Sequence, residues 1–284
     1  MSQPIGGGGP PPASLSADDF RRVTDLLYRW TGMTFRDNKH YYIERRVAER
    51  VRHSGAADMR QYLALLASDA AERQALINAC TVNETYFYRE DYQFAALARD
   101  LLPRIIERRR PGDLVRLWSL PCSTGEEPYS IAIWLLENWR LVDAYNVEIV
   151  GSDIDTHAVE QARAGCYGRR ALSRMPPALV DLYFEAEHRH RRRIIADLRE
   201  SVHFTAANII DSASVAAQGR FDVVLCRNLL IYFDEASRAA AAANLFDALN
   251  PGGFLCLGHS ESMARIDERF ILLRLADAIV YRKP

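Results

Sequence analysis

The sequence contains few cysteines, and they lie far apart along the chain. No two of them form a C-x-x-C pair, which argues against a structural zinc site, and their odd number argues against a disulfide framework. Free thiols are typical of a reducing compartment, so we expect a cytoplasmic protein that binds no metal ion. The cysteines are Cys80, Cys122, Cys166, Cys226 and Cys256.

A long hydrophobic run and an excess of one charge are also missing. No apolar stretch is long enough to cross a bilayer, so we expect no membrane insertion. Residues 1–14, MSQPIGGGGPPPAS, lack the basic and apolar regions of a signal peptide and are predicted to form a flexible leader. The formal net charge is -1, which does not favour nucleic acid as a partner.

The chain after this leader has a helical period. Ser16 is a candidate N-cap for a helix whose apolar stripe includes Phe20 and Leu27. Three more amphipathic segments follow, at residues 41–52, 59–67 and 71–80. We therefore predict an all-α N-terminal domain over residues 15–90 and a linker helix over residues 91–112.

Beyond the string RRRPGD, the period changes to strands that alternate with helices. Segments such as LVRLWSL, VEIVGSD and FDVVLC read as strands, and EEPYSIAIWLLENW reads as a helix. This alternation predicts an α/β domain over residues 113–284, with a parallel sheet and a ligand site at the carboxyl ends of its strands. Residues 167–202 break the alternation, and we expect a small antiparallel β insertion there.

The first turn from strand to helix, LPCSTGEEPYS, is unsuited to a pyrophosphate. It has one glycine, Gly125, where a dinucleotide site needs G-x-G-x-x-G, and it adds two carboxylates, Glu126 and Glu127. Such a turn suits a cationic ligand without phosphate, and S-adenosylmethionine (SAM) fits this description. The alternative is that the two acids stabilise the start of a helix.

Polar residues also follow two later strands. Asp153 ends the second strand, where its carboxylate is placed to accept hydrogen bonds from ribose hydroxyls, although a helix N-cap is the alternative. Arg227, Asn228 and Tyr232 follow the strand FDVVLC, in the segment CRNLLIYFD. Tyr232 is a candidate for the methyl-transfer site, and a buried core aromatic is the alternative.

Five blocks together, NETYFYRE, CSTGEEPYSIAI, GSDIDTHAVEQARAGCY, FDVVLCRNLLIYFD and LNPGGFLCLGHSES, resemble the CheR family. Members of this family are SAM-dependent glutamate O-methyltransferases that act on bacterial chemotaxis receptors. The resemblance covers about residues 15–284. It implies a Rossmann-like class I SAM methyltransferase domain with a small β insertion, preceded by a helical domain.

The resemblance also implies roles for individual residues. Arg89 and Tyr232 would steer the substrate, and S-adenosylhomocysteine would be the product. Arg46, Arg50 and Arg52, on the second helix, would bind the receptor. The residues implied in cofactor binding are Asn83, Thr85, Arg89, Glu127, Asp153, Asn208, Ile209, Arg227 and Asn228.

A glutamate carboxylate is already ionised in the cell, so no general base is needed. His259 in GHSES is therefore interpreted as structural. The alternatives are a methyltransferase that acts on a small acid or RNA, and a non-catalytic SAM-binding module. We expect a monomer whose partners are the receptor's cytoplasmic helices. The insertion lacks a glycine-containing loop, so we expect no dependence on a receptor C-terminal pentapeptide.

Overall fold

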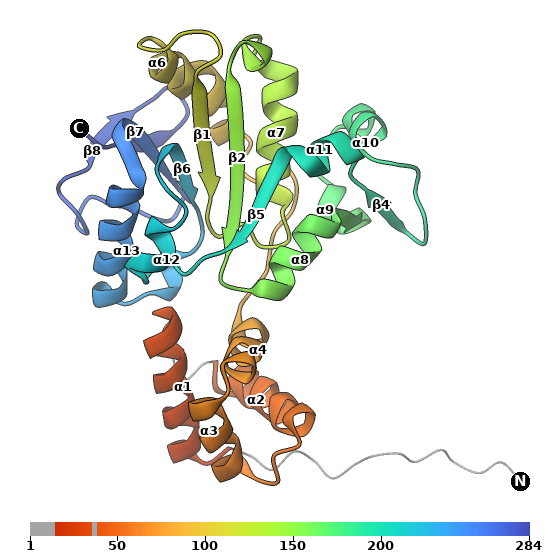
Figure 1. Ribbon diagram of the computed structural model, residues 1–284, viewed down its shortest axis with the longest axis vertical. Coiled ribbons are helices and arrows are strands. Elements are labelled where there is room, and N and C mark those ends of the chain that lie inside the picture. The colour runs from red at the N-terminus through yellow and green to blue at the C-terminus, as the bar shows by residue number, and fades with distance from the viewer. Residues whose placement is uncertain (1–14, 36–38) are drawn as a thin grey trace, which may run out of the picture. The chain divides into compact units, whose positions relative to one another are not determined.

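The computed structural model describes residues 15–35 and 39–284, so the predicted leader over residues 1–14 lies outside the described residues. The chain forms two compact units, which divide between Thr81 and Val82 (Figure 1). The predicted domain limits at residues 90 and 112 stay a prediction. Within the described residues, no helix is long and apolar enough to cross a membrane.

The first unit is helical, as its apolar spacing predicts. In α1, the Ser16 hydroxyl accepts a hydrogen bond from the Asp19 amide, and the helix buries Phe20, Val23 and Leu27. Gly32 ends this helix in the left-handed conformation, which glycine adopts at little cost. The helices of this unit are α1 (Ala17–Thr31), α2 (His40–Ser54), α3 (Met59–Ser68) and α4 (Ala70–Cys80).

The second unit is built on a seven-stranded sheet in the order β5-β2-β1-β6-β7-β9-β8. The first five strands in this order run parallel, and β9 pairs antiparallel with both β7 and β8. The predicted α/β class is therefore confirmed. The strands are β1 (Leu114–Ser119), β2 (Asn146–Asp153), β5 (Val202–Ala206), β6 (Phe221–Cys226), β7 (Leu249–Leu257), β8 (Ile271–Arg274) and β9 (Ile279–Arg282).

Helices cover this sheet because its strands are apolar on both faces. Every residue of β6, FDVVLC, is buried, as expected of a central parallel strand. α8 packs on β2 and β5, and α13 packs on β7, near opposite ends of the sheet in Figure 1. The helices and short 3-10 turns here are α7 (Glu126–Asn138), α8 (Thr156–Ala164), α12 (Ser212–Ala216), α13 (Glu235–Ala248), η3 (Val142–Ala144) and η4 (Leu230–Tyr232).

The segment predicted as a linker helix is helical and joins the core of the second unit. It comprises α5 (Tyr92–Ala96), a π turn η2 (Leu97–Leu101) and α6 (Leu102–Ile106). The π turn comes just before Pro103, which has no amide hydrogen to donate to a regular helix. Phe94, Leu97, Leu101 and Leu102 are buried in the cluster that also contains Val115 and Leu117 of β1.

The predicted β insertion is also confirmed. β3 (Cys166–Gly168) pairs antiparallel with β4 (Arg191–Arg193). Three short helices accompany this pair: α9 (Arg169–Leu172), α10 (Pro177–Tyr183) and α11 (Ala196–Ser201). The insertion follows α8 along the chain and leads into β5 (Figure 1).

Candidate active site

The direction of the sheet's connections reverses between β1 and β6. From β1 the chain goes to β2 on one side, and it returns later to β6 on the other side. In open α/β sheets such a reversal leaves a crevice at the carboxyl ends of the strands. Residues 120–125 after β1 and residues 227–228 after β6 are therefore at the expected ligand site.

The turn after β1 is held close to its surroundings. Gly125 has φ 95°, and an added Cβ would lie 2.8 Å from Ala162 Cβ and 2.9 Å from the Tyr167 hydroxyl. A larger residue would therefore force this turn away from α8 and β3. The single glycine of the motif serves this close approach, and it immediately precedes α7.

Asp153 fixes the same turn from the end of β2. One carboxylate oxygen accepts from the Ser123 amide at 2.7 Å, and the other accepts from the Asp155 amide at 2.9 Å. The N-cap of α8 is Asp155, so the alternative of a helix cap does not apply to Asp153. Burial raises the pKa of Asp153 to about 6, although the two backbone hydrogen bonds oppose this shift.

Asn83 brings the start of NETYFYRE to this turn. Its side-chain amide donates to Asp155 at 2.7 Å, and its carbonyl oxygen accepts from the Ser123 hydroxyl at 3.0 Å. Segments more than 30 residues apart along the chain therefore meet here. Thr85 lies two positions further on and is half-buried.

The two acids of the turn have different surroundings. Glu126 is buried and accepts from the Thr124 hydroxyl at 2.6 Å, and its burial raises its pKa. Glu127 accepts from the Ser119 hydroxyl at 2.8 Å and from the Arg227 guanidinium at 2.7 Å. Burial raises the pKa of Glu127, and Arg227 opposes that shift by stabilising the charged form.

Arg227 is buried between two carboxylates. Its guanidinium contacts Glu127, lies 3.1 Å from Glu90 and donates to the Arg89 carbonyl oxygen at 2.6 Å. Burial on its own would raise the pKa of Glu90, but Arg227 and His259 together lower it. Two carboxylates, Glu90 and Glu127, thus face one guanidinium here, and this arrangement favours a cationic ligand.

Glu261 is a functional candidate that the sequence did not reveal. One of its oxygens accepts from the Asn228 amide at 2.7 Å and from the Gly258 amide at 2.9 Å, so it joins the ends of β6 and β7. Asn228 has φ 58°, which this contact helps to hold. The motif GHSES draws attention to its histidine, although the glutamate makes these backbone contacts.

The remaining predicted cofactor residues lie after β5. Asn208 accepts from the Ile210 amide at 3.3 Å through its side-chain oxygen. The buried Ile209 accepts from the Asn244 side chain at 2.7 Å through its carbonyl oxygen. The loop that follows β5 is thus fastened to α13, the helix that packs on β7.

The two candidate catalytic side chains are accessible. Arg89 donates to the Glu84 carbonyl oxygen at 2.8 Å, and its guanidinium lies over the Tyr86 ring at 5.8 Å. Tyr232 ends η4 and is half-buried, whereas the adjacent Phe233 is buried. The alternative of a core aromatic therefore describes Phe233 better than Tyr232.

The arginines of α2 differ in their surroundings. Arg50 makes two hydrogen bonds to the buried Glu72, one of them from Nε at 3.0 Å, so it joins α2 to α4. Arg46 lies over the Tyr42 ring at 5.3 Å. Arg52 is exposed.

Comparison with known proteins agrees with this geometry. Residues 18–81 match the family described as CheR methyltransferase, all-alpha domain, and residues 83–279 match CheR methyltransferase, SAM binding domain. Fold, site and family model define a SAM-dependent methyltransferase. The chain belongs to the CheR methyltransferase family.

Individual relatives are similar over nearly the whole chain. "Chemotaxis protein methyltransferase 2" of Vibrio cholerae is 43% identical, covering 95% of this chain and 94% of the relative. The chemotaxis protein methyltransferase of Klebsiella aerogenes is 38% identical, covering 91% of this chain and 88% of the relative. That of Escherichia coli K12 is 35% identical, covering 91% and 89%.

A solved structure is similar only at a low score. Magnesium protoporphyrin IX methyltransferase from Synechocystis PCC 6803 with bound SAM aligns with 14% identity and a TM-score of 0.37. The alignment covers 96% of this chain and 100% of that chain. The family assignment therefore depends on the family models and the relatives.

Proposed function

We propose that this enzyme transfers the methyl group of SAM to glutamate side chains on the cytoplasmic helices of chemotaxis receptors. The observation that carries the proposal is the attachment of NETYFYRE to the switch point of the sheet. Asn83 contacts the turn after β1, and the Arg89 carbonyl oxygen is held by Arg227 after β6. This attachment supports a role for the Arg89 guanidinium, which would attract the substrate carboxylate beside the expected cofactor site.

The chemistry of the donor set fits SAM. When bound, this cofactor supplies a methyl group on a sulfonium and carries a positive charge without phosphate. Glu127 and Asp153 provide negative charge at the ends of β1 and β2, and the turn has a single glycine where a pyrophosphate would need more. Together with them, the residues that we propose to contact SAM are Asn83, Thr85, Arg89, Asn208, Ile209, Arg227 and Asn228.

The task of the protein residues is positioning rather than proton transfer. The substrate carboxylate is ionised at neutral pH, since an ordinary glutamate has a pKa of about 4.3. Arg89 and Tyr232 would hold one carboxylate oxygen and leave the other free to attack, because equal binding of ground and transition states gives no rate advantage. Alignment of the reacting atoms can lower the barrier by several kcal/mol.

The test is to incubate the purified protein with SAM and a receptor cytoplasmic fragment, and to locate the product by peptide mass spectrometry. We expect methylation of glutamate residues within the receptor helices. A methyl group on another residue type, or an unmethylated receptor fragment, would support a methyltransferase with a different substrate.

We also propose that α2 contributes to receptor docking through Arg46 and Arg52. Receptor methylation regions in this family are helical and rich in glutamate, and opposite charges favour encounter with such a surface. Arg50 contributes less than its position suggests, because its guanidinium already pairs with Glu72. We further propose that the enzyme is monomeric and acts in the cytoplasm.

The insertion supports independence from a receptor C-terminal pentapeptide. Its hairpin turn consists of Arg189 and His190, which have φ 50° and 63°, and no glycine widens it into a loop. The edge strand β4 is only three residues long, and all three are arginines. A short, charged edge is a poor template for the addition of a peptide strand.

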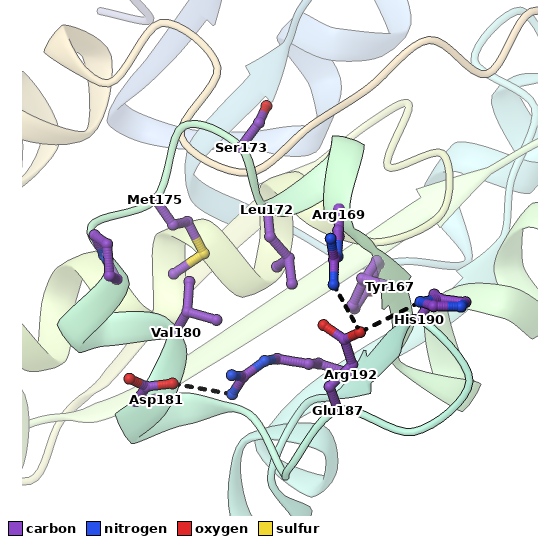
Figure 2. A pocket seen from close by; sticks show the side chains of 11 residues that line it. Tyr167, Arg169, Leu172, Ser173, Met175, Val180, Asp181, Glu187, His190 and Arg192 are labelled. Carbon is purple, nitrogen blue, oxygen red and sulfur yellow. Dashed lines mark hydrogen bonds and ion pairs between the residues drawn. The ribbon is translucent and has the colours of Figure 1, made fainter.

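Three basic side chains of this insertion form ion pairs within it. Figure 2 shows a pocket of about 540 Å³ beside β3, in which Arg169 and His190 approach Glu187 and Arg192 approaches Asp181. Arg191 and Arg193 of β4 donate to the carbonyl oxygens of Cys166 and Ala164. We expect no binding in a titration with the aromatic- and acid-containing pentapeptide that some receptors carry, and low-micromolar binding would contradict this proposal.

A further inference from the structure

The backbone on both sides of Arg89 has an unusual conformation. Tyr88 and Glu90 have φ 61° and 56°, in the left-handed region that residues with a side chain seldom occupy. Such a conformation costs free energy and persists only where surrounding contacts enforce it. The contacts that enforce it here therefore fix the position of the Arg89 backbone, from which the side chain extends.

Three contacts with parts of the chain that are distant in sequence hold the backbone of this segment. The Phe87 amide donates to the Ala171 carbonyl oxygen of α9 at 2.9 Å. The Tyr88 amide donates to the Ser130 hydroxyl of α7 at 3.1 Å. The third contact, from Arg227 to the Arg89 carbonyl oxygen at 2.6 Å, is the one nearest to the Arg89 side chain.

The orientation of Arg227 depends in turn on Glu90. The Glu90 carboxylate lies 3.1 Å from the same Arg227 nitrogen that donates to the Arg89 carbonyl oxygen. The guanidinium of Arg227 is 2% exposed and pairs with Glu127 on its other side, so it lies between two carboxylates. Without the charge of Glu90, Glu127 would be the only carboxylate left to orient this guanidinium.

Glu90 is itself held by residues around the end of β7. Its second oxygen lies 2.8 Å from His259 Nδ1. Its first oxygen also accepts from Gln93 Nε2 at 3.0 Å, and this amide nitrogen donates to the Leu257 carbonyl oxygen at 2.9 Å. These contacts hold the Glu90 side chain, which is 13% exposed, in one position. Glu90 can therefore orient Arg227.

We propose that Glu90 is a positioning residue for methyl transfer. It orients Arg227, Arg227 fixes the Arg89 carbonyl oxygen, and the Arg89 side chain is thereby directed at the substrate carboxylate. This inference rests on the proposed role of Arg89. A displacement of about 1 Å in a group that aligns the substrate can lower the rate about 100-fold.

The test compares Glu90→Gln with Glu160→Gln, an exposed position on α8. We expect Glu90→Gln to lower kcat about 10- to 100-fold. The SAM dissociation constant from calorimetry should change less than kcat, since Glu127 keeps its contact with Ser119 and Asp153 keeps its contacts with the turn. Glu160→Gln should leave both quantities as in the unmodified protein. A parallel loss of SAM binding and turnover in Glu90→Gln would contradict the inference.

A double variant separates positioning from a general structural role. If Glu90 acts through Arg89, Glu90→Gln should cost little further in an Arg89→Ala background. If the fold-losses in kcat of the two single variants multiply in the double variant instead, Glu90 acts independently of Arg89 and the inference is wrong. Full turnover by Arg89→Ala alone is a different outcome, because it overturns the proposed role of Arg89 and the inference with it.

Discussion

At the scale of single residues, the carboxylates of the site have different roles because their surroundings differ. Asp153 and Asp155 are two positions apart at the end of β2, yet one holds the turn after β1 and the other caps α8. Glu126 contacts the turn, whereas Glu127 reaches across to β6 through Arg227. The negative charge that these contacts do not neutralise would attract the positively charged SAM.

The raised pKa of Asp153 gives a prediction for cofactor binding. Its carboxyl group is neutral below about pH 6 and ionised above it. Since the ionised form attracts a cation, SAM affinity should rise with pH through this range. Below about pH 6 the affinity should fall by up to about tenfold per pH unit.

Calorimetry from pH 5 to 8, at about 25 °C, would measure this effect. Asp153→Asn should bind SAM more weakly than the unmodified protein at neutral pH and should lose most of the pH dependence. Glu126 and Glu127 also have raised pKa values, so a slope that persists unchanged in Asp153→Asn would assign the titration to them.

At the scale of elements, the turn between β1 and α7 is set by a close approach. Gly125→Ala should destabilise the protein by about 2–4 kcal/mol, because a Cβ there meets Ala162 in addition to the cost of a positive φ. Chemical denaturation would measure the loss.

The chain offers a matched control for this variant. Gly112 has φ 89°, and an added Cβ would meet nothing within 4 Å. Gly112→Ala should therefore carry only the conformational cost, about 1–2 kcal/mol. Equal losses at the two glycines would show that contact with α8 and β3 is unimportant at Gly125.

A second prediction at this scale concerns α2. Arg52→Glu should raise the KM for receptor and make the rate less sensitive to salt, since an exposed charge mainly steers encounter. Arg21→Glu on α1 is the matched control, because it makes the same change of charge at another exposed position. Equal effects of the two reversals would indicate overall charge and not docking by α2.

The elements themselves could largely be predicted from the sequence. Buried parallel strands read as apolar runs, as in FDVVLC, and the change of period after RRRPGD separates them from the amphipathic helices. The π turn before Pro103 and the short helices of the insertion carry too few residues to show a period. They depend on packing against the rest of the unit.

At the scale of the whole molecule, the site is formed by residues that lie far apart along the chain, and their contacts could not be predicted from the sequence. Arg227 and Glu127 are 100 positions apart, and Glu90 and His259 are 169 positions apart. The motifs identified which strand ends carry polar residues, because an apolar strand followed by polar residues is a pattern within a short stretch of sequence. They could not reveal that Glu261 joins the ends of β6 and β7, or that Arg50 pairs with Glu72.

We propose that this CheR-family enzyme makes glutamate methyl esters on a receptor, and that Arg89 directs the substrate carboxylate. The most direct measurement supplies SAM with a labelled methyl group and a receptor cytoplasmic fragment, and then treats the isolated fragment with mild alkali. We expect the label to be released as methanol, and we expect Arg89→Ala to leave little label on the fragment. Label that resists alkali would indicate an N-methyl product and would contradict the assignment of a glutamate methyl ester.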